Sequence, residues 1–232
     1  RRQRQMCIRD SDVSVKNKFC HSLMYPDCFI ATQFPQSLNT EDKLSHRRTH
    51  MEYLDIVDEQ GQPTGEIVSR TLAHTEGIRH RTAHIWIVRR KNEHFQVLMQ
   101  KRAMSKDSFP GKYDTSSAGH IQAGDEPLAS GLRELAEELG LHAKPEDLAF
   151  AGCIHGNFAE EFHGKIFRDN EIAFVYVYQQ PVDIETLVLQ KEEVESVRWF
   201  DLEETYQNCR NRNTQFCAPV PGLEVVRRYL YR

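Results

Sequence analysis

The chain has 232 residues, of which 39% are hydrophobic and 28% charged, which is enough for one domain with a sizeable core. Its formal net charge of −4 provides no broad basic surface for a nucleic acid polymer, so phosphate groups must be met by local basic side chains or by bound cations. No stretch approaches the roughly 20 apolar residues that span a bilayer. The six cysteines include no C-x-x-C pair, which argues against a zinc ribbon. We expect a cytoplasmic protein that acts on a small molecule, away from membranes, and the sequence is compatible with a homodimer.

Residues 1–50 lack the regular patterns of a folded domain. Residues 1–10, RRQRQMCIRD, resemble a translated sequencing adapter, and the rest of this stretch shows no sustained period of 2 or 3.6 before its basic end, SHRRTH. We therefore expect residues 1–50 to be a non-native or disordered extension and residues 51–232 to form the domain. The alternative is a genuine disordered or targeting extension, because termini containing Arg and Ser also serve as transit signals.

From Met51 onward, strand patterns come first. Residues 53–68 alternate around a Gly/Pro turn and predict a β-hairpin, while residues 81–88 and 95–102 predict two further strands. A long polar loop follows over residues 105–120. Loops of this length inside compact domains are usually functional.

The strongest helix is predicted over residues 127–139, with Pro127 suited to its first position and Gly140 to its end. Strands are expected over residues 148–158 and 172–180 and just before a short acidic helix near Glu203, and residues 222–231 predict an amphipathic helix. Strands interleaved with two or three helices indicate the α/β (α+β) class, with a mixed sheet sandwiched between helices.

One face of the 127–139 helix carries an unusual cluster of acids. Its leucines recur at offsets of 3 and 4 and predict a buried stripe, whereas Glu134, Glu137 and Glu138 gather on the side roughly opposite. Like charges at these spacings repel each other unless a cation lies among them. A solvated acidic face is the ordinary alternative, but clustered carboxylates also suit Mg²⁺ bound to a phosphate-bearing substrate.

The segment from Gly119 to Leu141 resembles the Nudix box, G-x5-E-x7-R-E-U-x-E-E-x-G-U with U apolar. Gly119, Arg133 and the three glutamates stand at their expected positions, while Asp125 replaces the first glutamate. The resemblance implies the Nudix fold and hydrolysis of a diphosphate in a nucleoside diphosphate derivative or similar small compound, with Mg²⁺ or Mn²⁺ as cofactor. The implied metal ligands are the three glutamates, with Asp125 as a weaker candidate because its side chain is one methylene shorter.

The resemblance also implies roles around the metal helix. Arg133 would orient a glutamate through a charge-assisted hydrogen bond, and Gly119 would let the loop backbone approach the substrate closely. Glu171 precedes an apolar strand and is a candidate general base or further metal ligand. Lys101 and Arg102 are candidate substrate contacts, although basic residues in loops are usually solvated.

Residues 70–125 are also similar to type 1 isopentenyl-diphosphate isomerase, a Nudix-fold relative. The resemblance implies a second metal group, with its candidates being His74, His80, His120, Asp169 and Glu171. Two departures disfavour isomerisation, because Ala118 stands where that family has its catalytic cysteine and the R-E-U-x-E-E string is intact. The remaining alternative is a ligand-sensing Nudix module, which the retained glutamates argue against. For His84 we expect an ordinary structural role.

Overall fold

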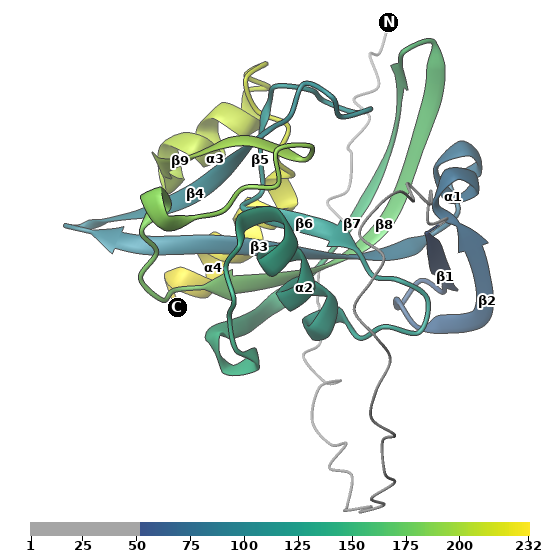
Figure 1. The fold of residues 1–232 in the computed structure, drawn as a ribbon, viewed down its shortest axis with the longest axis horizontal. Coiled ribbons are helices and arrows are strands. Elements are labelled where there is room, and N and C mark those ends of the chain that lie inside the picture. The colour runs from purple at the N-terminus through teal and green to yellow at the C-terminus, as the bar shows by residue number, and fades with distance from the viewer. Residues whose placement is uncertain (1–51) are drawn as a thin grey trace, which may run out of the picture. The chain divides into compact units, whose positions relative to one another are not determined.

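A mixed β-sheet forms the centre of the fold (Figure 1). The computed structural model describes residues 52–232, so the expectations for residues 1–50 lie outside the described part of the chain. The seven-stranded sheet runs in the order β5-β4-β3-β8-β7, with β6 added to β3 and β9 to β4. Its strands are β3 (His80–Lys91), β4 (His94–Arg102), β5 (Tyr113–Asp114), β6 (Ser117–His120), β7 (Leu148–Phe162), β8 (Lys165–Tyr178) and β9 (Val194–Asp201).

The sheet is mixed because β3 and β8 run parallel while its other pairs are antiparallel. A separate two-stranded hairpin precedes it, made of β1 (Tyr53–Val57) and β2 (Pro63–Ser69). The helices are α1 (Arg70–Glu76), α2 (Pro127–Leu139), α3 (Leu202–Arg210) and α4 (Val220–Leu230), with 3₁₀ turns at Pro145–Asp147 and Ile184–Thr186. The predicted α+β class with a mixed sheet between helices is confirmed.

Alternation along β3 supplies one core on each face of the sheet. Ile85 and Ile87 are fully buried in the core shared with Leu135 and Leu139 of α2. On the other face, Trp86 joins the core that includes residues of α3 and α4. Because successive strand side chains point to opposite faces, a single strand can anchor helices on both sides.

Local signals fix α2 at the residues that the sequence predicts. Pro127 occupies the start, and Gly140 ends the helix in the left-handed region with φ of 64°. The Gly140 N–H donates to the carbonyls of Leu135 and Ala136, which satisfies the last turn. Leu135 and Leu139 are buried, Leu128 and Leu132 are partly buried, and Glu134 and Glu138 lie against β6.

Two features differ from the sequence prediction. The expected loop over residues 105–120 contains β5 and β6, whose backbones pair with β4 and β3. The short helix α1 was not predicted. It is capped by the Ser69 hydroxyl, which accepts from Leu72 N–H at 3.3 Å, and by Gly77 in the left-handed region. No helix among the described residues is both long and apolar enough to cross a membrane.

Candidate active site

One cavity of about 380 Å³ receives side chains from α1, α2, β3, β6, β8 and the loop after β4. Most of its polar lining consists of carboxylates and imidazoles. Those named by the sequence prediction that line it are His74, His120, Glu134, Glu137, Glu138, Asp169 and Glu171. His80 is not among the lining residues, but its ring packs against that of His74 with the two centroids 4.8 Å apart. The topology thus brings the acidic helix and the predicted histidines to one place.

The three glutamates of α2 differ in burial. Glu138 is 6% exposed, and its Oε2 accepts hydrogen bonds from Ala118 N–H at 3.2 Å and from the Gln100 side chain at 3.5 Å. Burial raises the pKa of Glu138 to about 8 and also raises the pKa of Glu134. Glu137 is exposed at the rim. Without a metal ion, ionised carboxylates at these positions are poorly solvated, which costs free energy, and a bound cation would offset this cost.

Gly119 allows Glu134 to reach the cavity. A Cβ placed on Gly119 would lie 2.1 Å from Cδ of Glu134, far inside van der Waals contact. Gly119 sits in β6 and pairs with Ala83 of β3. The glycine is therefore explained by the close approach of a carboxylate to the strand backbone.

Arg133 ties the metal helix to the preceding turn. Its guanidinium donates to Asp125 Oδ2 at 2.6 Å, to the His120 carbonyl at 3.1 Å and to Glu134 Oε1 at 3.2 Å. Asp125 does not line the cavity that contains the three glutamates. Asp125 is thus held by Arg133 outside the cavity lining, and its role as a metal ligand stays a prediction.

The second cluster lies beside the first and is held by α1, β3, β6 and β8. His74 Nε2 is 3.0 Å from His120 Nε2, and His74 Nδ1 is 3.6 Å from Asp169 Oδ1. The Asp169 oxygen is also 3.8 Å from His80 Nε2. Glu171 belongs to the same group, because one of its oxygens lies within 4.8 Å of ligand atoms of His80 and Asp169.

Protonation in this cluster suits metal binding. His80 Nδ1 donates to the Ile78 carbonyl at 2.9 Å, which leaves a lone pair on Nε2 of the neutral ring. Among the described residues, that Nε2 has no hydrogen-bond partner although it is buried, and the same holds for Asp169 Oδ1. Burial lowers the pKa of His80 and lowers the pKa of His74 to about 3, so both rings are neutral. Neutral imidazole nitrogens facing a buried carboxylate are a donor set that fits a divalent transition metal.

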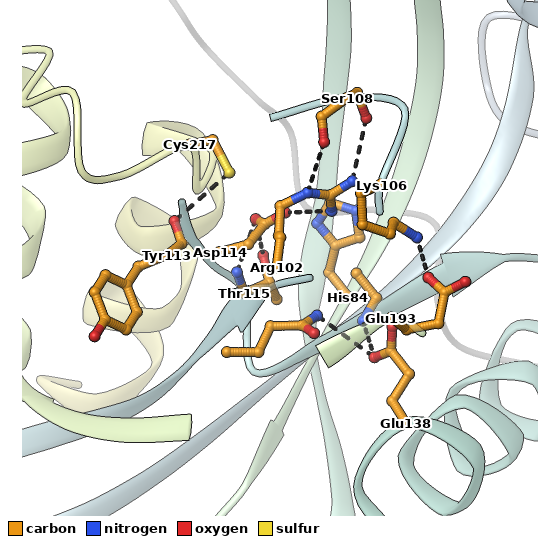
Figure 2. Close-up of polar contacts among 12 residues, drawn as sticks. His84, Arg102, Lys106, Ser108, Tyr113, Asp114, Thr115, Glu138, Glu193 and Cys217 are labelled. Atoms are coloured by element: carbon orange, nitrogen blue, oxygen red, sulfur yellow. Dashed lines mark hydrogen bonds and ion pairs between the residues drawn. The ribbon is translucent and has the colours of Figure 1, made fainter. Parts of the chain in front are cut away.

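The predicted basic contacts behave differently from each other. Lys101 is not among the residues that line the cavity, and its Nζ donates to Glu195 at 2.7 Å. Arg102 lines the cavity, where it donates to Asp114 at 3.0 Å and to the carbonyl and hydroxyl of Ser108 at 3.0 and 3.1 Å. Figure 2 shows Arg102 with its partners on one side and Glu138 of α2 on the other. Arg102 therefore lies where a substrate contact was expected, while a substrate contact of Lys101 stays a prediction.

Sequence reasoning missed several residues of the lining, among them Lys106 and His84. Lys106, in the loop after β4, lines the cavity and pairs with Glu193. His84, expected to be structural, is 7% exposed and lines the cavity with Nε2 3.4 Å from Glu171 Oε1. Its spacing of two and four residues from Thr82 and His80 places all three on one face of a strand, which is the signal that could have found it.

Comparisons with known proteins indicate the family of this chain. A family model of the NUDIX domain matches residues 78–216. An uncharacterised Nudix hydrolase of Clostridium acetobutylicum is 40% identical over 153 residues, which cover 66% of this chain and 71% of that protein. Nudix hydrolase 3 of Arabidopsis thaliana is 40% identical over 170 residues, covering 72% of this chain but only 21% of that protein. The crystal structure of the Deinococcus radiodurans protein DR0079 is similar with a TM-score of 0.55 and 19% identity, covering 78% of this chain and 100% of that chain, which is a likeness of fold.

Proposed function

The chain belongs to the Nudix hydrolase family, and from this we propose that it hydrolyses a diphosphate bond in a small molecule with the help of Mg²⁺ or a similar divalent ion. The substrate would be a nucleoside diphosphate derivative or another small diphosphate. One observation carries the proposal. Glu134, Glu137 and Glu138 line a single cavity together with His74 and His120 of the second cluster, and such a set of donors suits metal ions that bind phosphate.

Two groups of side chains would hold the metal ions. The first consists of Glu134, Glu137 and Glu138 of α2, whose oxygens suit Mg²⁺. The second consists of His74, His80, His120, Asp169 and Glu171, whose mixed nitrogen and oxygen donors suit Mn²⁺ or another transition metal. When bound, such ions neutralise diphosphate charge and make a coordinated water more acidic. Because the two groups open into one cavity, a single diphosphate would contact both.

Side chains of the protein would stabilise the phosphoryl oxygens, accept a proton from water and orient a metal ligand. Arg102 and Lys106 bring positive charge to the cavity side opposite α2, where phosphoryl oxygens would be stabilised. Burial raises the pKa of Glu171 to about 7, the range in which a carboxylate can accept a proton from water near neutral pH. We therefore assign Glu171 as general base or metal ligand, and Arg133 as the residue that orients Glu134.

The competing activity is isomerisation of isopentenyl diphosphate. That reaction needs an acid and a base on opposite sides of a carbon skeleton. Ala118, at the resembling position of the missing cysteine, lines the cavity and pairs with His84 across the sheet, and its methyl group cannot transfer a proton. Hydrolysis needs no group at that position, so the lining favours it.

The test is a screen of the purified protein against diphosphate compounds with Mg²⁺, Mn²⁺ or EDTA. We expect release of phosphate or a monophosphate with a divalent ion and none with EDTA. The ligand-sensing alternative instead predicts binding without turnover. Turnover that is unaffected by EDTA would show that the reaction does not depend on the proposed divalent metal ion.

A further inference from the structure

Four phenylalanines form an apolar wall on one side of the cavity. This phenylalanine wall consists of Phe109, in the loop after β4, and Phe158, Phe162 and Phe167, in the outer part of the β7–β8 hairpin. The Phe109 ring lies 4.9 Å from Phe162 and 5.9 Å from Phe158, and Phe167 lies 6.1 Å from both Phe158 and Phe162, centroid to centroid. Figure 1 shows the loop after β4 extending toward that hairpin. Two segments far apart in sequence therefore build one surface.

The wall is continuous with the metal-binding side chains. Phe167 stacks on His74 with a centroid distance of 4.3 Å and an interplanar angle of 20°. Phe109, Phe158 and Phe167 line the same cavity as the three glutamates. A diphosphate bound by both groups of candidate metal ligands would place the substituent that it carries next to these rings.

The backbone at Phe109 is unusual. Its φ of 49° lies in the left-handed region, which is unfavourable for a bulky side chain. The neighbouring residue is fixed, because Arg102 binds both the carbonyl and the hydroxyl of Ser108. An unfavourable conformation held by its surroundings is typical of functional segments. Here it turns the Phe109 ring toward the hairpin.

The arrangement of the rings indicates the kind of group that fits. The planes of Phe109 and Phe158 are inclined by 54°, those of Phe109 and Phe162 by 76°, those of Phe162 and Phe167 by 77° and those of Phe158 and Phe167 by 32°. None of these neighbouring pairs is parallel, so the wall does not form a parallel slot for a flat base. Phenyl rings also carry no hydrogen-bond donor or acceptor with which to read the edge of a base. The surface suits a compact hydrocarbon group bound by burial alone.

We propose that the phenylalanine wall binds an apolar, hydrocarbon-like group attached directly to the diphosphate, which makes the substrate a non-nucleoside diphosphate ester. This inference rests on the proposed function, since it narrows the substrate of the same site. It assigns Phe109, Phe158 and Phe167 to substrate selection.

The test compares benzyl diphosphate, methyl diphosphate and ADP-ribose with Mg²⁺. For the wild type we expect kcat/KM for the benzyl ester to exceed that for the methyl ester by about tenfold or more. Phe158→Ala should lower kcat/KM for the benzyl ester about tenfold while changing the methyl ester less than about twofold, and Phe158→Leu should restore most of the loss. Phe150→Ala is the matched control, because Phe150 is on the same strand, is 49% exposed and lies outside the cavity lining.

Binding is measured in parallel as the rise in melting temperature that each ester gives with Mg²⁺. If no compound is hydrolysed but benzyl diphosphate stabilises the wild type more than methyl diphosphate does, and Phe158→Ala abolishes the difference, the wall is supported and the proposed hydrolysis fails. Equal kcat/KM values and equal rises in melting temperature for the two esters would overturn the proposal that the phenylalanine wall binds the substrate. So would equal losses for both esters in Phe158→Ala, or a preference for ADP-ribose that Phe158→Ala leaves unchanged.

Discussion

Burial controls the charge of individual residues in the cavity. It raises the pKa of Glu138 to about 8 and the pKa of Asp169 to about 7, and it lowers the pKa of His74 to about 3. The acids therefore tend to be protonated and the imidazoles neutral when no cation is bound. Both shifts reduce the charge of a poorly solvated site.

The pKa shifts predict how metal-free stability depends on pH. A carboxyl group whose pKa is higher in the folded than in the unfolded state contributes stability that is lost as pH rises toward the folded value. Histidines with a lowered pKa act oppositely, but only below the unfolded value of 6.5. Between pH 6.5 and about 8 the carboxyl groups determine how stability changes with pH, so the melting temperature in EDTA should fall as pH rises.

Differential scanning calorimetry in EDTA measures this slope. Glu138→Gln should flatten it, because Gln cannot titrate, and added Mg²⁺ should stabilise the wild type more at pH 8 than at pH 6.5. A melting temperature that rises steadily across this range in EDTA would contradict the assigned protonation.

Substitution of the glutamates separates catalysis from folding. Glu137→Gln or Glu138→Gln should lower kcat about 10²- to 10⁴-fold, because each removes a proposed metal ligand, while the melting temperature without metal should change little, because Gln keeps the shape of Glu without its charge. The control is Glu146→Gln, an exposed residue away from the cavity. Full activity of both cavity variants with Mg²⁺ would show that the metal assignment is wrong.

At the scale of elements, the packing of α2 against β6 sets the site. Gly119→Ala should displace Glu134, since the added Cβ would overlap its carboxylate, and should lower kcat about a hundredfold. In a Glu134→Ala background the same change should have little further effect. Steady-state kinetics of the double-mutant cycle test this, and additive losses would mean that Gly119 acts in another way.

The sequence predicts those elements whose signals are local. Pro127, Gly140 and the leucine stripe define α2, and its bounds agree with the prediction. By contrast, β5 and β6 have no period of their own, because β6 exists through pairing with β3 and β5 through pairing with β4. The short helix α1 depends on its caps and on tertiary contacts that a seven-residue segment does not reveal.

In the candidate site too, some residues could be predicted from the sequence and others depend on the tertiary structure. The glutamates of α2 could be named from spacing alone, and resemblance to a known family added His74, His80 and His120. The cavity position of His84 could have been inferred from its alternation with His80 and Thr82 along β3. The cavity position of Lys106 could not be named, because Lys106 lies in a loop whose path the sequence does not fix. Resemblance also could not show that Asp125 is held by Arg133.

At the scale of the whole molecule, the described residues contain three apolar cores and both groups of candidate metal ligands. We predict that a chain beginning at Met51 folds with the melting temperature and activity of the full chain. Calorimetry and kinetics on the two proteins, prepared side by side, measure this. A large loss of either property in the shorter chain would show that residues 1–50 contribute to the structure.

The central claim is that metal-dependent hydrolysis of a diphosphate takes place in this cavity. It is tested most directly by phosphorus and proton NMR of the protein in D₂O with Mg²⁺ and a panel of benzyl diphosphate, ADP-ribose and isopentenyl diphosphate. We expect at least one diphosphate to be cleaved, with cleavage stopped by EDTA and strongly reduced in Glu138→Gln, and no deuterium to enter isopentenyl diphosphate. Deuterium uptake into isopentenyl diphosphate, with no cleavage of any compound, would contradict the claim and identify an isomerase.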